Sequence, residues 1–233
     1  MPSSQSRGAI LLAGASRGLG LGLTAEYLSR GWQVIATARQ PDRATGLQAL
    51  LELHPGLLTI QKLDVADTAS ASALASCLVG QTLDVLFVVA GISTYSDTQA
   101  HLIDHAAVGQ EFITNAIAPL AVAEAMRASL APGATVVFMT SILGSIASNA
   151  GGGMELYRAS KAALNMLASC YALRHKSHPV ILMHPGWVRT ELGGANAPLD
   201  VPTSARGMAE ALAAYKGRPG LAYVDYQGHK LPW

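Results

Sequence analysis

The sequence predicts an α/β fold in which one doubly wound parallel sheet carries helices on both faces. Six short apolar runs alternate with five longer segments of helical spacing along the 233 residues. The short runs are apolar at nearly every position, which is typical of parallel strands that are buried on both sides. No linker or change of composition divides the chain, so residues 1–233 are predicted to form a single domain.

The predicted strands and helices alternate strictly from the first strand to the last. Each strand is a short run rich in β-branched and other apolar residues, and each helix carries alanine and leucine at helical spacing. Because consecutive parallel strands need a crossover, every predicted helix must pack on one face of the sheet. The predicted strands span 9–14, 33–38, 57–64, 83–91, 134–141 and 180–186, and the predicted helices span 20–31, 43–55, 68–80, 104–132 and 154–177.

The composition favours a well-packed protein without a polyanionic partner. Half of the residues are hydrophobic and 13% are charged, whereas an ordinary soluble domain has about 25% charged residues. Such a chain can bury a large core, and its low charge indicates that another subunit covers part of the surface. Sixteen basic residues nearly balance fifteen acidic ones, so we expect no nucleic acid and no membrane as partner.

Cysteine and histidine usage gives no sign of a disulfide or a metal site. Cys77 and Cys170 lie far apart in predicted helices, so we expect two buried free thiols, as in a cytoplasmic protein. His101 and His105 are one helical turn apart, but no acidic ligand set accompanies them, so no metal is predicted. The first 18 residues contain only a short apolar run that glycine interrupts, which makes a poor signal peptide and is too short for a membrane span. A cytoplasmic location is therefore expected.

A glycine-rich turn follows the first predicted strand. Gly14, Gly18 and Gly20 have the spacing G-x-x-x-G-x-G and stand where the strand runs into a helix. Glycines there allow a sharp turn and a close backbone approach to a pyrophosphate, which the helix N-terminus stabilises. An ordinary strand-to-helix turn would also tolerate glycine, but this context favours dinucleotide binding in a Rossmann-like fold.

The end of the second predicted strand indicates which dinucleotide is bound. An acidic residue at this position would bind the ribose 2′-hydroxyl of NAD and repel a 2′-phosphate. The chain instead has Thr37 and Ala38, followed by Arg39, and Arg17 lies in the glycine-rich turn. Each arginine alone could be an ordinary solvated side chain, yet two planar guanidinium groups suit a phosphate dianion. The sequence therefore predicts NADP as cofactor.

Tyr157 and Lys161 lie four residues apart in a predicted helix, so both side chains project from the same face. They could form a structural pair, or the lysine could adjust the acidity of the phenol. A free tyrosine has a pKa near 10, and a neighbouring ammonium stabilises the phenolate and lowers that pKa by roughly 1–3 units. Ser141, after the fifth predicted strand, could cap the next segment or hydrogen-bond a substrate carbonyl. Together the three side chains indicate carbonyl reduction.

With these motifs in place, the chain closely resembles the short-chain dehydrogenase/reductase family from its first strand to the C-terminus. The glycine-rich turn reads AGASRGLG, the tyrosine and lysine occur as YRASK, and the other motifs keep the order that is typical of the family. LGSI, GGGMELYRASKAALNM, HPGWVRTELGG and a short tail ending in GHKLPW are similar to its C-factor/sniffer-like carbonyl reductase branch. The remaining family motifs are LDV at 63–65, LDVLFVVAG at 83–91, TNAIAP at 114–119, TS at 140–141 and HPGWVRT at 184–190.

The resemblance implies a role for each matching residue and a small carbonyl or alcohol as substrate. In the family, the equivalents of Asn115, Ser141, Tyr157 and Lys161 form a catalytic tetrad, in which the asparagine holds a water beside the lysine and the lysine also binds the nicotinamide ribose. The resemblance further implies a homodimer or tetramer that pairs through helices near 104–131 and 155–176. The implied cofactor-binding residues are Gly14, Ser16, Arg17, Gly18, Leu19, Gly20, Arg39, Asp64, Val65, Ala90, Gly91, Tyr157, Lys161, Pro185, Gly186, Val188 and Thr190.

The chain departs from the family pattern at two places. Val88 and Val89 stand where the family usually has two asparagines, which help to brace the strands beside the cofactor, so the local geometry there is open. Ser141 also precedes Tyr157 by sixteen residues, a few more than is usual. The extra length contains Gly151–Gly153, which is predicted to form a flexible lip over the substrate.

Three functions remain open from the sequence. The first is an NADPH-dependent reductase of a small ketone or aldehyde. The second is a signalling or regulatory protein that keeps the cofactor site as a sensor, and the complete tetrad counts against it. The third is an acyl-carrier-linked 3-oxoacyl reductase, which the short C-terminal region and the missing basic docking face disfavour.

Overall fold

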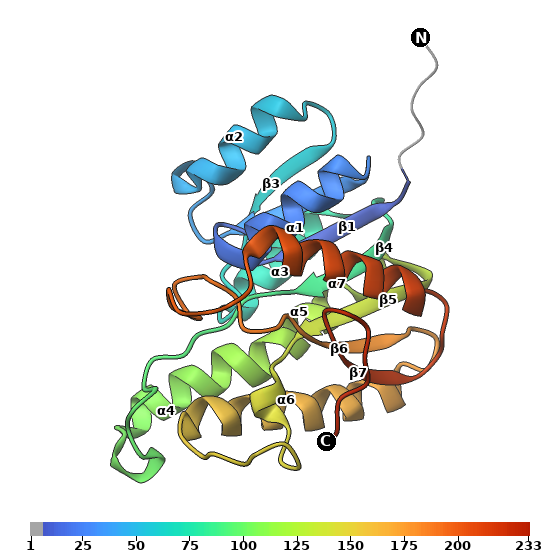
Figure 1. Cartoon of the computed structure of the whole chain (residues 1–233). Helices are drawn as coiled ribbons and strands as arrows, with labels where there is room; N and C mark the ends of the chain where they lie inside the picture. Colours follow the sequence, from blue (N-terminus) through green and yellow to red (C-terminus); the bar gives the residue numbers. More distant parts are fainter. Residues whose placement is uncertain (1–6) are drawn as a thin grey trace.

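The computed structural model describes residues 7–233, and its centre is one sheet of seven parallel strands (Figure 1). The strand order is β3-β2-β1-β4-β5-β6-β7, so the direction of winding reverses between β1 and β4. In open parallel sheets, ligands bind at such a reversal, outside the carboxyl ends of the strands. The predicted fold class is confirmed. The strands are β1 (Ala9–Ala13), β2 (Gln33–Ala38), β3 (Leu58–Lys62), β4 (Leu83–Val88), β5 (Leu130–Met139), β6 (Val180–His184) and β7 (Leu221–Asp225).

Helices cover both faces of the sheet and enclose two hydrophobic layers. On one face α1, α2 and α7 bury side chains such as Leu23, Leu47 and Met208, and α1 lies beside α7 (Figure 1). On the other face α3, α5 and α6 bury Leu74 and Leu164, among others. The helices are α1 (Gly18–Ser29), α2 (Thr45–Leu53), α3 (Thr68–Cys77), α4 (His105–Phe112), α5 (Ala118–Ala125), α6 (Glu155–Arg174) and α7 (Val201–Tyr215).

Burial on both faces explains why the central strands are apolar at successive positions. In β1 every side chain from Ile10 to Ala13 is fully buried, and in β6 the run from Val180 to Met183 is buried as well. Neighbouring side chains of one strand point to opposite faces, so both layers need apolar residues. The strands therefore form a rigid platform whose carboxyl ends position the loops of the site.

The sequence analysis missed two C-terminal elements, α7 and β7. The helix begins after Asp200, whose carboxylate accepts a hydrogen bond from Thr203 N at 2.8 Å, and a proline stands in its first turn. Both are helix-start signals, but the glycine- and proline-rich stretch before them favoured a loop. β7 is short and only partly buried, because it is the edge strand. The C-terminal tail runs back along this edge, where Leu231 N donates to Tyr223 O at 2.9 Å.

The predicted helix 104–132 is continuous from His105 to Ala125 with an irregular centre, whereas its predicted last residues form a short helix, η4 (Arg127–Ser129), and the start of β5. α4 leads into a π-helical segment, η3 (Ile113–Ile117), which leads into α5. The span His105–Ala125 is long and apolar enough to cross a membrane by length and composition alone, and 44% of its apolar window is buried inside the protein. It packs against α3 and α6, and core helices pass the same test, so the span is weak evidence for a membrane segment.

Two further expectations are affected by the structure. Cys77 and Cys170 are free, as predicted, but both are exposed and not buried. Cys77 is the last residue of α3 and Cys170 lies on the outer face of α6, so neither reaches the core. The expectation about the N-terminal stretch rests in part on residues 1–6, which lie outside the described residues.

Candidate active site

The turn between β1 and α1 can be built only with glycine. Gly14 has a φ of 95°, and a Cβ placed there would lie 2.8 Å from the Cβ of Ala90. A Cβ on Gly20 would lie 2.1 Å from the carbonyl oxygen of Gly14. Because these two positions carry no side chain, the backbone can turn closely from β1 into α1, which begins at Gly18. The turn is therefore a cradle that fits a pyrophosphate at a helix N-terminus.

Thr37 holds this turn in place. Its hydroxyl accepts a hydrogen bond from Gly14 N at 3.0 Å and donates to Leu12 O at 3.2 Å, while its carbonyl accepts from Ala15 N at 2.7 Å. The side chain is fully buried. The sequence had identified Thr37 only as a neutral residue in place of an acid, whereas in the structure it braces β1 and β2.

A cavity of about 1040 Å³ lies beside the cradle, at the carboxyl ends of β2 and β3. Four of the predicted cofactor-binding residues line it, namely Ser16, Arg17, Arg39 and Asp64. Two further basic residues, which the sequence analysis did not select, also line it: they are Arg43 and Lys62. Four basic side chains against two acidic ones, Asp64 and Asp67, make this cavity suitable for an anionic group such as a phosphate.

Arg17 has a partner that the sequence did not reveal. Its guanidinium forms an ion pair with the carboxylate of Glu191, and both side chains are mostly exposed. Exposed ion pairs contribute little to stability, so Arg17 can exchange this carboxylate for a phosphate. Of the two arginines predicted to select NADP, Arg39 has no such acidic partner among the ion pairs of the described residues.

The loop after β4 keeps its position although the family's asparagines are missing. The amides of Val89 and Ala90 both donate to Ala13 O, at 2.9 and 3.0 Å. Val88 is a regular β4 residue paired with Ala13. Backbone hydrogen bonds and apolar packing thus replace the asparagine brace, and the loop continues to Gly91.

Ser141 and Tyr157 meet at the carboxyl end of β5. Ser141 is 7% exposed and its Oγ accepts a hydrogen bond from Leu143 N at 3.1 Å, which caps the short helix η5 (Ile142–Gly144). Tyr157, in the first turn of α6, is also buried. Burial raises the pKa of Tyr157 to about 12, against the lowering effect of its hydrogen bond with the Ser141 side chain. The serine is therefore both a cap and a partner of the phenol.

Lys161 lies one turn further along α6 and is 2% exposed. Its Nζ donates to Met139 O at 2.9 Å and lies 5.7 Å from the centre of the Tyr157 ring. Burial lowers the pKa of the Lys161 amine to about 8. The expectation that this lysine gives the phenol a lowered pKa is wrong for the folded chain, because burial of the phenol outweighs the other effects.

Asn115 is completely buried in the π-helical segment η3. Its Nδ2 donates to Ile92 O at 2.7 Å and to Ser160 Oγ at 3.0 Å, and its Oδ1 accepts from Ile92 N at 2.8 Å. Ser160 Oγ in turn donates to Tyr157 O at 2.8 Å. The asparagine thus ties the loop after β4 to α6, and π-helical turns of this kind are frequent at functional sites.

Residues outside the predicted tetrad hold Ser141 and its surroundings in position. The Tyr223 hydroxyl, from β7, donates to Ser141 O at 2.6 Å. Thr140 Oγ1 donates to Asn165 Oδ1 at 2.7 Å. The backbone of η5 also approaches α6 so closely that a Cβ on Gly144 would lie 2.9 Å from the Lys161 carbonyl carbon. Ser141 and Lys161 are therefore fixed relative to each other.

The segment after β6 borders the cradle from the other side. Gly186 has a φ of 83°, and Pro185 O accepts from Ser204 Oγ at 2.6 Å. Val188 is buried and pairs with Leu199 in an isolated bridge. A Cβ on Gly18 would lie 3.6 Å from Thr190 Cγ2, so this segment touches the glycine-rich turn.

The remaining predicted cofactor residues have mixed surroundings. Leu19 packs against the hydrophobic layer of α1, and Val65 packs against the opposite layer. The carboxylate of Asp64 accepts from Ala66 N at 3.1 Å, and the Asp64 amide donates to Ser70 Oγ. Leu19 and Val65 therefore have structural contacts of their own, whereas Asp64 also lines the basic cavity.

The glycine-rich lip at Gly151–Gly153 is tied to α6 and is not free. The Arg158 guanidinium donates to the carbonyls of Gly152 and Gly153, at 2.8–3.2 Å. The next residue, Met154, has a φ of 49°, and its amide donates to Ser96 O at 3.2 Å. The lip thus joins the loop after β4 directly above the first turn of α6.

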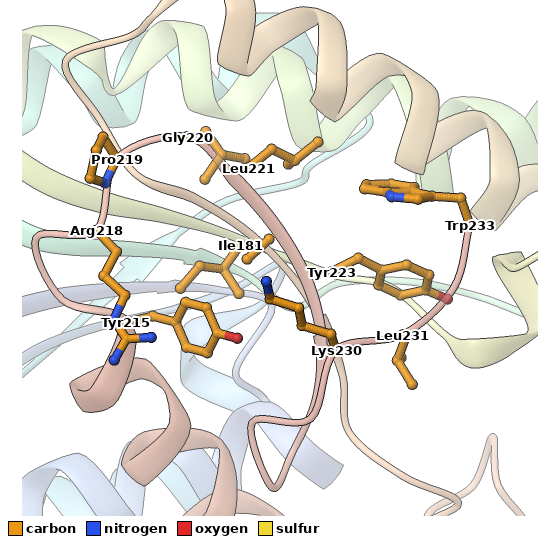
Figure 2. A pocket seen from close by; sticks show the side chains of 12 residues that line it. Ile181, Tyr215, Arg218, Pro219, Gly220, Leu221, Tyr223, Lys230, Leu231 and Trp233 are labelled. Atoms are coloured by element: carbon orange, nitrogen blue, oxygen red, sulfur yellow. The ribbon is translucent and has the colours of Figure 1, made fainter.

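A second cavity lies at the opposite end of the sheet (Figure 2). Its volume is about 350 Å³, and its walls come from the first residues of β6 and β7, the end of α7 and the C-terminal tail. Tyr215, Arg218 and Lys230 border it (Figure 2). No predicted site residue lines this cavity, and it lies at the amino ends of the strands, so it is not the candidate active site.

Within the described residues, no group of three or more histidine, cysteine, aspartate and glutamate side chains could hold a metal ion. His101 is exposed near the end of the loop after β4, and His105 is exposed at the start of α4. The chemistry that the site offers is therefore that of a buried phenol, a hydroxyl and a buried amine beside a dinucleotide cradle.

Comparison with known proteins gives a consistent result. The sequence profile of the family described as short chain dehydrogenase matches residues 8–198. The chain is 39% identical to C-signal of Myxococcus xanthus over 155 residues, which are 65% of this chain and 93% of that protein.

Two solved structures are similar over nearly the whole chain. A short-chain dehydrogenase/reductase from Burkholderia multivorans with bound NADP has a TM-score of 0.94 at 40% identity, over 97% of this chain and 100% of that one. The carbonyl reductase Sniffer of D. melanogaster has a TM-score of 0.89 at 30% identity, over 97% of this chain and 99% of that one. The resemblance found in the sequence, including its C-factor/sniffer-like branch, is confirmed.

Proposed function

This chain belongs to the short-chain dehydrogenase family, and from that premise we propose that it reduces a small ketone or aldehyde with NADPH. The protein is an NADP-dependent oxidoreductase. The single observation that carries the finer proposal is the position of Tyr157, whose buried phenol interacts with the Ser141 side chain and which has Lys161 one helical turn away.

The residues of the site fit the proposed cofactor. The cradle has no room for a side chain at Gly14 or Gly20, and Gly18 has a positive φ of 54°, so glycine suits all three positions of a turn that holds a pyrophosphate closely. The basic cavity beside it supplies Arg39, with Arg43 as a further cation, for a 2′-phosphate. Bound NADPH supplies the hydride that the protein itself lacks.

Each tetrad residue has a proposed task. Tyr157 donates its proton to the oxygen of the carbonyl as that oxygen gains negative charge. The Ser141 hydroxyl binds the same oxygen and stabilises its charge. Lys161 acts on the phenol and binds the cofactor, and Asn115 holds the loop after β4 against α6. The remaining cofactor contacts are proposed as the family pattern implies them.

The proposal extends to assembly and location. The substrate is small, and we propose a homodimer or tetramer in which α4, α5 and α6 meet their copies. Exposed apolar side chains on these helices support this, among them Ile117 and Met166. We also propose that the protein works in the cytoplasm, which the two free thiols support.

A direct test is NADPH oxidation by the purified protein with a panel of aldehydes, ketones and 3-oxoacyl thioesters. We expect turnover with at least one small carbonyl compound and little with thioesters. If the protein bound NADPH but reduced none of these compounds, the proposed reaction would be wrong.

A signalling role is the second candidate, because the chain is similar to C-signal of Myxococcus xanthus. A protein that acts only as a cofactor sensor would need the cradle but not the phenol and the serine hydroxyl together. Cells that carry a Tyr157→Phe chain distinguish the two. An unchanged phenotype relative to the normal chain would support signalling, whereas a phenotype like that of a deletion would support the reductase.

A further inference from the structure

A buried carboxyl group lies beside the tetrad and has no task in the reaction described so far. Glu111, in α4, is 1% exposed. Its Oε2 accepts a hydrogen bond from Thr94 N at 3.2 Å, and its Oε1 is buried without a hydrogen-bond partner among the described residues. Carboxylates are almost never fully buried unless a cation is near. The surroundings of Glu111 should therefore contain a positive charge.

The fold brings Glu111 and Lys161 to the same short segment, the one that follows β4. Glu111 lies one turn before Asn115, so both side chains project from one face of the helix. Both bind the segment after β4, Asn115 at Ile92 and Glu111 at Thr94. Gly91, where this segment starts, lies between them and α6, because a Cβ there would be 3.3 Å from Asn115 Oδ1 and 3.3 Å from Lys161 Nζ.

Lys161 is the cation that couples to this carboxyl group. Burial raises the pKa of Glu111, and the Lys161 ammonium opposes that effect. Burial also lowers the pKa of the Lys161 amine, and the negative charge of Glu111 opposes this lowering. The same charge raises the pKa of Tyr157, in addition to burial.

The other ionisable groups on the neighbouring elements have different partners or face solvent. The carboxylate of Glu155 accepts from Ala100 N at 2.8 Å, and Arg158 donates to the glycine carbonyls of the lip. The remaining ones are Tyr95, half-buried, and Asp97, His101, Asp104 and His105, which are all exposed. The buried charges near the tetrad are thus Glu111 and Lys161.

We propose that Glu111 is a positioning residue whose carboxylate is the counter-charge of Lys161. It keeps the buried amine in its ammonium form and holds the segment 92–94 against the helix. Through Lys161 it sets the pH at which Tyr157 can donate its proton. This last step rests on the proposed function, whereas the charge pairing does not.

The charge pairing is tested without turnover. The chain has only five lysines, so the titration of Lys161 can be followed by NMR of lysine labelled with ¹³C at Cε, with Lys161→Arg to assign the signal. Glu111→Gln keeps the size and the acceptor for Thr94 N but removes the charge. We expect Lys161 to lose its proton about one pH unit lower in this variant. Glu111→Asp, with the charge further away, should give a smaller shift in the same direction.

The matched control is Glu155→Gln, which removes an exposed carboxylate from the first turn of the same helix as Lys161. It should leave the Lys161 titration in place. If Lys161 titrated alike in the unchanged protein, in Glu111→Gln and in Glu111→Asp, the pairing would be disproved. If Glu111→Gln does not fold, Glu111→Asp alone tests the pairing. A shift of the Lys161 titration to lower pH supports the pairing, and no shift or a shift to higher pH disproves it.

Activity gives the second readout. Removing the charge lowers the pKa of both Lys161 and Tyr157, so the alkaline limb of kcat/KM for carbonyl reduction should move to lower pH in Glu111→Gln. If the alkaline limb of kcat/KM stayed in place while the Lys161 titration shifted, the proposed effect of Glu111 on Tyr157 would be disproved. A shifted titration in a protein that reduces no carbonyl would leave the pairing intact and defeat only the proposed function.

Discussion

Burial makes the phenol of Tyr157 a weaker acid in the folded chain than a free tyrosine. With a pKa of about 12, the phenol keeps its proton throughout the neutral range. Reduction needs the protonated phenol as donor, whereas alcohol oxidation needs the phenolate as acceptor. If Tyr157 is the acid of the proposed reaction, we expect the rate of alcohol oxidation to rise with pH through the alkaline range, which steady-state kinetics at several pH values would measure.

Tyr157→Phe should abolish carbonyl reduction and leave NADPH binding nearly unchanged. The phenyl ring keeps the packing in the first turn of α6, but no proton reaches the substrate oxygen. General acid catalysis contributes about 10²–10⁴-fold to rates, so kcat should fall by at least that factor. Tyr171→Phe is a matched control, because this tyrosine lies in the same helix and its buried hydroxyl has no hydrogen-bond partner in residues 7–233. Normal turnover in Tyr157→Phe would contradict the assignment of the acid.

His184 makes the stability of the fold dependent on pH. Burial lowers the pKa of its imidazole to about 4 from 6.5, and the nearby charge of Asp225 only partly compensates. The unfolded chain therefore binds more protons than the folded one between these two values, so stability is lost as the pH falls from 6.5 to 4. The loss should reach about 3 kcal/mol at pH 4, because a pKa that differs by one between the folded and the unfolded chain corresponds to about 1.4 kcal/mol.

The measurement is urea unfolding of the normal protein and of His184→Gln at several pH values. The variant should lose less stability on acidification, because the neutral amide does not titrate. Equal acid sensitivity of the two proteins would show that other groups cause the loss.

At the level of elements, the ends of β2 and β3 decide which cofactor is preferred. We expect tighter binding of NADPH than of NADH. Arg39→Ala should weaken NADPH binding by about 1.5–3 kcal/mol, the range for a hydrogen bond to a charged group, and should hardly change NADH binding. Arg17→Ala should have a smaller effect, because Arg17 already has Glu191 as partner. Dissociation constants by fluorescence titration give the answer.

The control for cofactor preference is Arg127→Ala, since this exposed arginine lies in the short helix before β5, away from the basic cavity. It should bind both cofactors as the normal protein does. Equal dissociation constants for NADPH and NADH in the normal protein would contradict the cofactor preference.

The elements that the sequence predicted well are those whose pattern depends on local burial. All six predicted strands exist. Central strands such as β1 are apolar at successive positions because they are buried on both faces. β7, which is only partly buried, was not predicted, and the hydrogen bonds from the Val89 and Ala90 amides to Ala13 O could not be read from side chains at all.

The predicted site shows the same difference between local sequence patterns and contacts that form only on folding. The glycine cradle and the pair Tyr157 and Lys161 follow from short spacings within one turn or one helix. Glu111 lies 50 positions before Lys161 and Tyr223 lies 82 positions after Ser141, so their contacts with the site appear only in the folded chain. The pKa of Tyr157 was predicted in the wrong direction for the same reason, because burial is a property of the whole fold.

At the scale of the whole molecule, several uncovered apolar side chains lie on α6 and on the helix that runs from α4 to α5. Ile113 and Ile117, on the helix from α4 to α5, are 47% and 52% exposed, and Met166 and Leu173, on α6, are 66% and 69% exposed. α4 and α5 both contact α6, so these side chains lie on adjacent helices. Such a surface, in a chain with 13% charged residues, is typical of a subunit interface.

We therefore expect a dimer in solution that depends on this surface. Light scattering at micromolar concentration should give twice the 24.2 kDa of one chain, and Met166→Glu should shift the protein toward the monomer, because a charge buried without a partner opposes association. Leu167 is unsuitable for this test, since it packs against the core. Leu53→Glu is the control, because Leu53 is 72% exposed on α2, which covers the opposite face of the sheet. A mass of one chain at every concentration would refute the dimer, and equal effects of the two substitutions would place the interface elsewhere.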